Sequence, residues 1–514
     1  MSVPVYDWIA HHARRTPAKL AAIDLHSGRR FTYAEMESRV ARLAGYLGQG
    51  LGVGRGDRVG VLAANNTDMF EMQFACTRIG AVFLPLNWRL TVPELEFIVG
   101  DAGPSVLICD ADFAEAGAEL KSRCGIPHLV DVRGDGGDSA YERGIAGAEP
   151  VAGIVPLTHD DLSTIMYTSG TTGLPKGAMI THGMTFFNAV NLGIPMMIGP
   201  RTVQLTVLPL FHTGGLNCYS NPVFHGGGTV LVMRTFDPKE ALRLIGDPDL
   251  AITHFFGVPA NYQFMAQQPE FDDTDLSRLQ AAGIGGAPSP AALLETWAAR
   301  GIALQQGYGM TETSPTVTVL DAEFAVEKVG SAGKPALHAE VKLVREDGSE
   351  AAPGEVGELW ARGPNITPGY WNRPDATAES ITDGWLHTGD AATIDEDGFY
   401  YIVDRWKDMY ISGGENVYPA EVENVIYQLP DIAEAAVLGL PDEKWGEVGC
   451  VVAVLKPGGE LTEREIIAHC GERLARFKQP RSVVFVEALP RNATGKVLKR
   501  ELKDWLIEEA DAAE

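Results

Sequence analysis

The first 110 residues alternate between two hydrophobic periods. Short, nearly continuous apolar runs favour buried strands at 58–63, 81–86 and 105–109. Apolar residues recur at helical spacing in 36–47 and 67–79, and capping boxes at Thr32 with Glu35 and at Thr91 with Glu94 begin two helices. Strands that alternate with amphipathic helices in this way predict parallel sheets with helices on both faces.

The same texture continues through the middle of the chain and then changes. Strands are expected at 228–233 and 251–255, with a helix at 238–245 between them. After about residue 325, short strands and turns predict a β-rich subdomain that extends to about residue 405. Beyond residue 408 a compact α+β unit is expected, with a helix at 420–429, strands at 435–440, 448–455 and 482–486, and a capping box at Thr462 and Glu465. The predicted class is therefore α/β, with an N-terminal domain at 1–405 and a C-terminal domain at 406–514.

Length and composition limit the kind of protein. The chain of 514 residues exceeds the size of one hydrophobic core, and no apolar run approaches the ~18 residues of a membrane span. We expect a cytoplasmic enzyme, because neither end carries a signal or lipidation motif. Six scattered cysteines without a Cys-x-x-Cys pair argue against disulfides and structural zinc, and a net charge of −26 argues against a nucleic-acid partner.

One polar segment carries the first sign of chemistry. Residues 167–177 read Tyr-Thr-Ser-Gly-Thr-Thr-Gly-Leu-Pro-Lys-Gly and follow an apolar run at 162–166. Hydroxyls, a lysine and glycines that let the backbone approach an anion predict a phosphate-binding loop at the end of a strand. Its spacing lacks the second glycine and the following hydroxyl of a Walker A loop, and 283–288 ends in proline where a dinucleotide fingerprint has glycine. A flexible surface loop is the alternative interpretation.

Further motifs follow this loop in a characteristic order. They lie at 285–288 (Gly-Gly-Ala-Pro), 308–313 (Tyr-Gly-Met-Thr-Glu-Thr), 357–359 (Gly-Glu-Leu), 388–390 (Thr-Gly-Asp), 404–408 and 492–496 (Asn-Ala-Thr-Gly-Lys). With them, essentially the whole chain resembles the ANL superfamily of adenylate-forming enzymes. It is most similar to the bacterial feruloyl/coumaroyl-type and fatty-acyl CoA ligases. The resemblance implies a small, mobile C-terminal lid domain with a hinge near Lys407.

The resemblance also implies a reaction and the residues that perform it. A carboxylate attacks the α-phosphate of ATP, pyrophosphate leaves, and a thiol, CoA in this branch, then displaces AMP from the acyl-adenylate. Lys496 is expected to bridge the carboxylate and the α-phosphate, Thr311 to donate to that phosphate, Lys176 to hold the outer phosphates, and Glu312 with Thr168 to bind Mg²⁺. Residues expected to contact ATP or AMP are Thr168, Ser169, Gly170, Thr171, Thr172, Gly173, Lys176, Gly285, Gly286, Ala287, Pro288, Gln306, Gly307, Tyr308, Gly309, Met310, Thr311, Asp390, Ile402, Arg405 and Lys496.

A purely structural role stays open as the alternative for several of these residues. Tyr308, expected to stack on adenine, could be a buried core tyrosine, and Glu312 could be a solvated turn carboxylate. Asp390, expected to bind the ribose hydroxyls with Arg405, could form a plain surface ion pair. Lys496 could be one more exposed lysine beside Lys499.

The acid and the thiol acceptor are less specified. The resemblance places the acyl pocket at His212, Gly214, Gly215, Phe256 and Met310, and the CoA-facing loop at Ser412, Gly413 and Gly414. His212 could equally be a packed core histidine. A Phe-His pair at 211–212 disfavours an amino-acid substrate, because peptide-synthetase relatives carry Phe-Asp there. Asp237, in the other Phe-Asp pair, is predicted to be a helix N-cap. Ile411 stands where some relatives have a lysine, so a lysine-assisted thioester step there is not expected.

Three functional hypotheses follow. The first is a ligase that joins an aryl or fatty acid to CoA, with a homodimer as one open oligomeric state. The second is an enzyme that loads the acyl group onto a carrier-protein phosphopantetheine. The third, a non-catalytic ATP-binding scaffold, is disfavoured because Lys176, Glu312, Asp390, Arg405 and Lys496 are all present.

Overall fold

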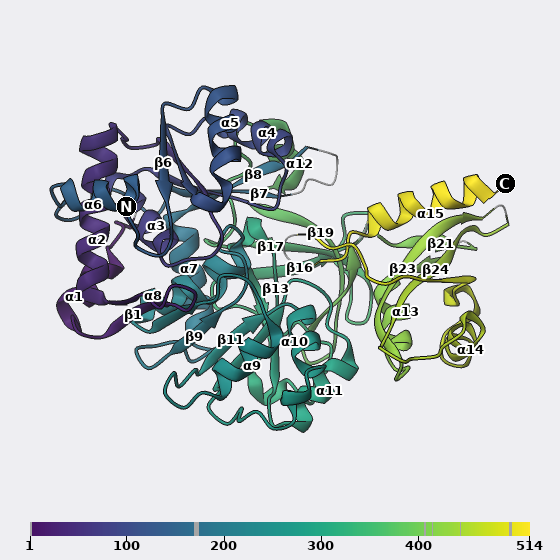
Figure 1. Cartoon of the computed structure of the whole chain (residues 1–514). Coiled ribbons are helices and arrows are strands. Elements are labelled where there is room, and N and C mark those ends of the chain that lie inside the picture. Colours follow the sequence, from purple (N-terminus) through teal and green to yellow (C-terminus); the bar gives the residue numbers. More distant parts are fainter. Residues whose placement is uncertain are drawn as a thin grey trace.

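The chain folds into a large and a small lobe, seen side by side in Figure 1. The computed structural model describes residues 3–168, 174–405, 408–413, 415–442, 444–492 and 496–513, with the backbone alone at 405 and 509–513. The N-terminus lies in the large lobe, and the small lobe carries the C-terminal helix α15 (Lys499–Ala513) along its outer edge (Figure 1). In the part of the chain that is described, no helix is long and apolar enough to cross a membrane.

Two mainly parallel sheets build most of the large lobe. One has the order β15-β14-β13-β12-β11-β9-β10-β1-β2 and the other β6-β5-β3-β4-β7-β8. In the first sheet, the parallel strands are β1, β9, β10, β11, β12 and β13, and each of β2, β14 and β15 pairs antiparallel with its neighbour. In the second sheet, only β8 runs antiparallel to its neighbour among the described strands. The strands are β1 (Leu20–Asp24), β2 (Arg30–Thr32), β3 (Arg58–Leu62), β4 (Val82–Leu86), β5 (Val106–Asp110), β6 (His128–Val132), β7 (Leu162–Thr168), β8 (Lys176–Thr181), β9 (Val203–Thr206), β10 (Thr229–Val232), β11 (His254–Gly257), β12 (Ala281–Gly285), β13 (Leu304–Gly309), β14 (Thr316–Val319) and β15 (Lys334–Pro335).

Helices cover both faces of these sheets. One buried cluster joins apolar side chains of both sheets to helices between them: α1 (Trp8–Arg15), α2 (Tyr33–Gly45), α3 (Asp68–Ile79), α6 (Ala140–Gly147), α7 (His182–Gly193) and α8 (Asn221–Gly226). The outer face of the first sheet packs on α9 (Pro238–Gly246), α10 (Pro259–Ala266) and α11 (Ala291–Ala299), and that of the second on α4 (Val92–Ala102) and α5 (Ala114–Cys124). This layering confirms the α/β class expected from the alternating pattern.

An antiparallel sheet completes the large lobe beside the small one. Its strands are β16 (Glu340–Val344), β17 (Gly357–Arg362), β18 (Ile381–Thr382), β19 (Trp385–Ile394) and β20 (Tyr400–Arg405), and α12 (Pro374–Ser380) precedes β18. The small lobe has its own sheet, made of β21 (Tyr410–Ser412), β22 (Glu415–Val417), β23 (Ile432–Asp442), β24 (Gly446–Leu455) and β25 (Ser482–Phe485). The helices α13 (Pro419–Ile426), α14 (Glu463–Arg473) and α15 pack against this sheet.

Several boundaries differ from the sequence expectation, among them those of β23, which runs from Ile432 to Asp442 instead of 435–440. The strand expected at 251–255 begins only at His254, and the helix expected to reach 429 ends at Ile426. The segment 167–177 is less of a loop than its composition suggests, since β7 extends to Thr168 and β8 begins at Lys176. Hydrogen bonding between the two antiparallel strands extends this hairpin into the polar segment, which has no hydrophobic pattern of its own.

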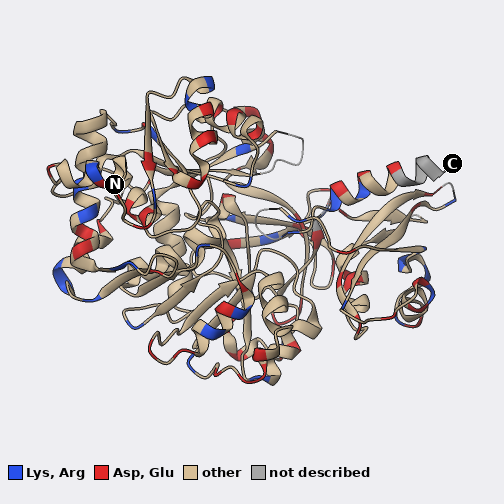
Figure 2. Cartoon of the chain, viewed as in Figure 1, with Lys and Arg blue, Asp and Glu red and all other residues tan. Residues whose placement is uncertain are grey.

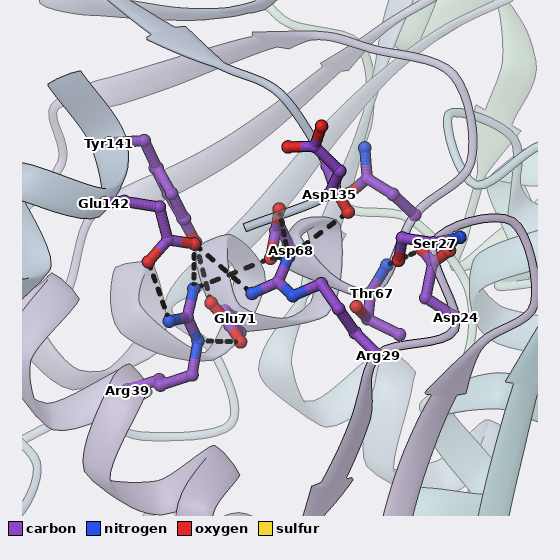
Figure 3. Close-up of polar contacts among 12 residues, drawn as sticks. Asp24, Ser27, Arg29, Arg39, Thr67, Asp68, Glu71, Asp135, Tyr141 and Glu142 are labelled. Atoms are coloured by element: carbon purple, nitrogen blue, oxygen red, sulfur yellow. Dashed lines mark hydrogen bonds and ion pairs between the residues drawn. The ribbon is translucent and has the colours of Figure 1, made fainter. Parts of the chain in front are cut away.

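Charges of both signs are spread over both lobes, without one basic face (Figure 2). One largely buried group of charges, which we call the ion network, lies between α2, α3 and α6 (Figure 3). It consists of Arg29, Arg39, Asp68, Glu71 and Glu142. Arg39 binds Glu71 at 2.6 Å and Glu142 at 2.8 Å, and Arg29 binds Asp68 at 2.8 Å. The ion network connects the N-terminal helices of the large lobe.

Candidate active site

The phosphate-loop candidates lie on the β7–β8 hairpin. Thr168 and Lys176 are cross-strand partners, and the Thr168 hydroxyl donates to the Lys176 carbonyl at 3.4 Å. The expected contacts at Ser169, Gly170, Thr171, Thr172 and Gly173 lie outside the described residues. Among the described residues Lys176 has no carboxylate within ion-pair distance, and its Nζ lies 5.3 Å from the centre of the Tyr370 ring. A lysine in such a position can neutralise a bound anion.

Glu312 lies beside this hairpin, on a short 3-10 turn that follows β13. Pro315 presses against Gly309, where any side chain would overlap its carbonyl, so the chain turns sharply and buries Thr311 and Glu312. The Tyr370 hydroxyl donates to Glu312 Oε1 at 2.8 Å, and the Thr367 N–H donates to the Glu312 carbonyl at 2.7 Å. Tyr370 therefore touches both Lys176 and Glu312, which rules out the interpretation of Glu312 as a solvated turn residue.

Tyr308 on β13 and Asp390 on β19 meet between the nine-stranded sheet and the antiparallel sheet of the large lobe. The Tyr308 hydroxyl donates to Asp390 Oδ2 at 2.6 Å, so the carboxylate is in a specific contact and not only in a surface ion pair. Asp390 on β19 is the register partner of Arg405 on β20, of which only the backbone is described. Tyr308 and Ile402 pack, half-buried, on the same apolar cluster. Gln306 is buried on β13 and donates to the Ser331 carbonyl at 2.9 Å.

Glu358 supports the irregular part of β19 before Asp390 from the neighbouring strand β17. Its carboxylate accepts from the Gly389 N–H at 2.9 Å and from Trp360 Nε1 at 2.8 Å. The Thr388 hydroxyl donates to the Leu359 carbonyl at 2.6 Å and accepts from the Asp390 N–H at 3.2 Å. These bonds connect the two motifs: residues 358 and 359 bind the backbone and side chain of residues 388 and 389.

The small lobe places Lys496 against the large lobe. A Cβ built on Gly286 would lie 4.0 Å from Lys496 Cε, and Gly286 itself has φ +84°, a conformation that favours glycine. Asn492 fixes the backbone of Lys496, accepting its N–H at 2.9 Å on Oδ1 and donating its own N–H to the Lys496 carbonyl at 2.8 Å. The interpretation of Lys496 as an ordinary exposed lysine does not fit this position.

His212, in the large lobe, lies close enough to Lys496 for the lysine charge to lower its pKa. Burial, with a smaller contribution from the Lys496 charge, lowers the pKa of His212 to about 3. The ring is therefore neutral at pH 7, and Nδ1 accepts the Gly214 N–H at 3.2 Å, which leaves the proton on Nε2. His212 can therefore donate one hydrogen bond to a ligand bound beside Lys496, but it supplies no charge.

The remaining acyl-pocket candidates surround the π-helical turn η3 (Gly214–Ser220) and β11. Gly215 is required for a backbone reason, because a side chain there would overlap the carbonyls of Leu208 and Pro209. Phe256 is half-buried on β11, and Met310 is half-buried after β13. Ala287 and Pro288 continue the chain from Gly286 beyond β12.

The CoA-facing candidates lie on the small lobe. Gly413 has φ +62°, its N–H donates to the Trp445 carbonyl at 2.8 Å, and a Cβ there would meet the Trp445 ring at 2.9 Å. Ser412 is buried on β21, while Gly414 and the hinge candidate Lys407 lie outside the described residues. Trp445 lies 5.0 Å from Lys444 Nζ and 6.0 Å from the Arg481 guanidinium carbon, measured to its ring centre.

Sequence reasoning missed Tyr370, Glu358 and Trp445 as neighbours of these residues. Tyr370 and Trp445 stand in segments with no phosphate-like composition, and their position is set by long-range packing. For Glu358 a signal was available, because this charged residue lies within the recognised motif at 357–359.

The large lobe holds Lys176 on the β7–β8 hairpin and the buried Glu312, and the small lobe places Lys496 beside Gly286. Residues of these types are typical of nucleotide-dependent enzymes. A family model described as "AMP-binding enzyme" matches residues 9–371, and "AMP-binding enzyme C-terminal domain" matches residues 421–496. The chain belongs to the family of AMP-binding enzymes.

Similar proteins cover nearly the whole chain. Feruloyl-CoA synthase of an Amycolatopsis species is 44% identical over 496 residues, which are 96% of this chain and 98% of that protein. A long-chain-fatty-acid–CoA ligase of Mycobacterium tuberculosis is 39% identical over 498 residues, covering 96% and 97%. The solved structure of o-succinylbenzoate CoA synthetase from Bacillus subtilis, in complex with its acyl-adenylate intermediate, has a TM-score of 0.85 at 34% identity, covering 98% and 99%.

Proposed function

We propose that this enzyme joins an aryl carboxylic acid to CoA through an acyl-adenylate. In the first step a carboxylate oxygen attacks the α-phosphorus of ATP, and the bond to pyrophosphate breaks. In the second step the thiol of CoA attacks the acyl carbon, loses its proton and releases AMP. The observation that carries the proposal is Lys496, which reaches from the small lobe to Gly286 and His212 of the large lobe.

The first step needs positive charge and donors around a crowded set of anions. Lys496 supplies a cation between the carboxylate and the α-phosphate, and Thr311 supplies a hydroxyl donor. Lys176 and the hairpin it ends hold the outer phosphates. Asp390, oriented by Tyr308 and by the Glu358-supported backbone of β19, accepts hydrogen bonds from the ribose. Lys176 begins β8 and Asp390 lies within β19, so the sheets hold both side chains in place before the substrates bind.

A magnesium ion fits the same site. Glu312 offers a buried carboxylate, one oxygen of which accepts from Tyr370, and Thr168 offers a hydroxyl nearby on the hairpin. Hard oxygen donors of this kind suit Mg²⁺, which would neutralise phosphate charge when bound.

The second step requires a surface that recognises CoA. The loop at Ser412 and Gly413 lies against Trp445, whose ring is flanked by Lys444 and Arg481. An aromatic face with adjacent cations suits an adenine ring and phosphates. The function requires the small lobe to turn about 406–408 after adenylation, so that this surface replaces Lys496 at the site.

The relatives named above act on feruloyl, long-chain fatty and succinylbenzoyl groups. An aryl acid is favoured here because the Phe256 ring packs over Gly283 and Gly285 of β12, which gives the sheet a flat apolar surface. A small set of acids tests the proposal: benzoic, cinnamic, hexanoic, palmitic and succinic acid, each assayed for pyrophosphate release with ATP and Mg²⁺.

Each acid is assayed with and without CoA. We expect pyrophosphate release with an aryl acid and acyl-CoA formation only when CoA is present. Release without any acyl-CoA would instead support loading of a carrier protein. If no acid released pyrophosphate, the proposed adenylation would be wrong.

A further inference from the structure

Tyr219 presents a polar group that the fold leaves unused. Its side chain is 1% exposed, and its hydroxyl has no hydrogen-bond partner within the described part of the chain. A buried hydroxyl without a partner is unfavourable, so its retention calls for an explanation. Burial also raises the pKa of Tyr219, which keeps the hydroxyl protonated and able to donate.

The hydroxyl lies against the sheet surface that bears the acyl-pocket candidates. Phe256 on β11 is the register partner of Gly283 on β12, and the Phe256 and Tyr219 rings are 5.4 Å apart. A side chain at Gly283 would overlap the Tyr219 hydroxyl and would lie 2.9 Å from Phe256 Cδ2. Glycine at 283 therefore lets Tyr219 bring its hydroxyl directly onto the strand.

The same face of the sheet continues toward Lys496. Residues two apart on a strand share a face, so Gly285 follows Gly283, and Gly285 pairs with Gly307 on β13. A Cβ on Gly285 would lie 3.8 Å from Phe256 Cζ, and the next residue, Gly286, is the one beside Lys496. The strand surface from Tyr219 to Lys496 therefore carries glycines, and the Phe256 ring packs over Gly283 and Gly285.

Its length suggests what it binds. Three residues of strand, from Gly283 to Gly286, span about 10 Å. We propose that Tyr219 is a specificity-determining residue, which donates a hydrogen bond to an oxygen at the far end of a flat, hydroxylated aryl acid whose carboxylate lies at Lys496. The proposal rests on the proposed function and names its substrate class. An acid without the far oxygen leaves the Tyr219 hydroxyl unpaired, and sites built to bind a hydroxyl discriminate strongly on that ground.

The test compares two acids in two enzymes. The probes are 4-hydroxycinnamic and cinnamic acid, and kcat/KM is measured by pyrophosphate release for the wild type and for Tyr219→Phe. We expect the wild type to favour the hydroxylated acid by at least about tenfold, and Tyr219→Phe to lose that preference while cinnamic acid changes by less than about twofold. A preference that survives in Tyr219→Phe, or a wild type that treats both acids alike, overturns the proposal.

Tyr262→Phe is the matched control. Tyr262 is equally buried, but its hydroxyl donates to the Gly283 carbonyl at 2.9 Å and its ring packs in the cluster on the outer face of the sheet. This variant should lower activity toward both acids by the same factor, so a selective loss in Tyr262→Phe also counts against the proposal. Activity with cinnamic acid separates the two levels: if it is present without hydroxyl discrimination, only the role of Tyr219 fails. If neither acid nor any other releases pyrophosphate, the proposed function itself fails.

Discussion

The ion network and the site around Glu312 both gather charged side chains in the large lobe, but they satisfy them differently. In the ion network, Arg39 and Arg29 are bound by the carboxylates of Asp68, Glu71 and Glu142 at 2.6–3.2 Å (Figure 3). At the site, Lys176 has an aromatic ring and no carboxylate beside it within the described residues.

The difference separates charge used for folding from charge kept for ligands. Arginines and carboxylates that bind one another inside the protein offset their desolvation and hold helices together. A lysine at the edge of a hairpin that contacts the Tyr370 ring, and forms no ion pair within the described residues, can still attract an anion. The two regions should therefore respond to mutation in different measurements.

Removing the central cation of the ion network should have the largest effect. Arg39→Met leaves Glu71 and Glu142 without their closest cation in a buried environment. We expect the free energy of unfolding to fall by about 3–5 kcal/mol, as measured by urea denaturation. The kcat per folded molecule should change little.

A surface arginine provides the control for this loss. Arg243 binds Glu240 at 2.7 Å on α9 but is 58% exposed. Arg243→Met should cost no more than about 0.5 kcal/mol. Equal losses for the two variants would mean that burial does not distinguish them.

Lys496→Ala should give the next largest effect, now on chemistry. Loss of a cation that acts on the transferring phosphate lowers the rate of acyl-AMP formation by about 10²–10³-fold, or about 3–4 kcal/mol. Thioester formation from supplied acyl-AMP and CoA should stay within about threefold, because in the proposed function the small lobe turns and carries Lys496 away. Single-turnover assays of the two half-reactions measure both rates.

Lys503→Ala is the control for the small lobe. Lys503 lies on α15 near Lys496 in sequence and pairs at the surface with Glu447 at 3.1 Å. Both half-reactions should keep their rates in this variant. If Lys496→Ala slowed both half-reactions alike, the turn of the lobe would lose its support.

Tyr370→Phe should have a smaller effect, confined to magnesium. The variant keeps the ring beside Lys176 but removes the donor that orients Glu312. Partners of a metal ligand typically change metal affinity by about tenfold or more, so the Mg²⁺ concentration for half-maximal activity should rise by about that factor. Tyr167→Phe removes a similar bond, to Asp101 at 2.6 Å, and should leave the Mg²⁺ dependence unchanged. A shift of the same size in both variants would contradict the assignment of Glu312.

The sequence predicted the elements well where periodicity was strong, and poorly where contacts are long-range. The capping boxes at Thr32, Thr91 and Thr462 begin α2, α4 and α14 as expected, because the signal is local. The sheet orders were not predictable, since β1 pairs with β10 more than 200 residues away. Asp237 caps α9 as expected, accepting the Glu240 N–H at 2.7 Å.

The site followed the same rule. Glu312, Asp390 and Lys496 were named from their motifs, but Tyr370, which contacts Glu312, comes from a segment 58 residues further along the chain. Tyr219 could not be singled out by composition, because an unpaired hydroxyl is defined by its surroundings. Motifs locate ligand contacts, whereas packing determines what orients them.

The smallest expected effect concerns pH and the ion network. Burial first, and then the nearby Glu71 charge, raises the pKa of Asp68 to about 7, although Arg29 and Arg39 oppose the shift. Three carboxylates facing two arginines favour retention of one proton in the folded protein. In the unfolded chain this aspartate releases its proton near pH 3.9. Its contribution to stability is therefore complete below about pH 4 and is lost as the pH rises through about 7.

Asp68→Asn removes that proton exchange. The unfolding free energy of the wild type relative to Asp68→Asn should decline as the pH rises from about 5 to 7.5, with a slope of at most about 1.4 kcal/mol per pH unit for one proton. Urea denaturation of both proteins across this range measures the difference. If the relative stability instead rose with pH, Asp68 would be ionised throughout and held by Arg29. The ion network would then be fully charged, and the contrast with the site would rest on pairing alone.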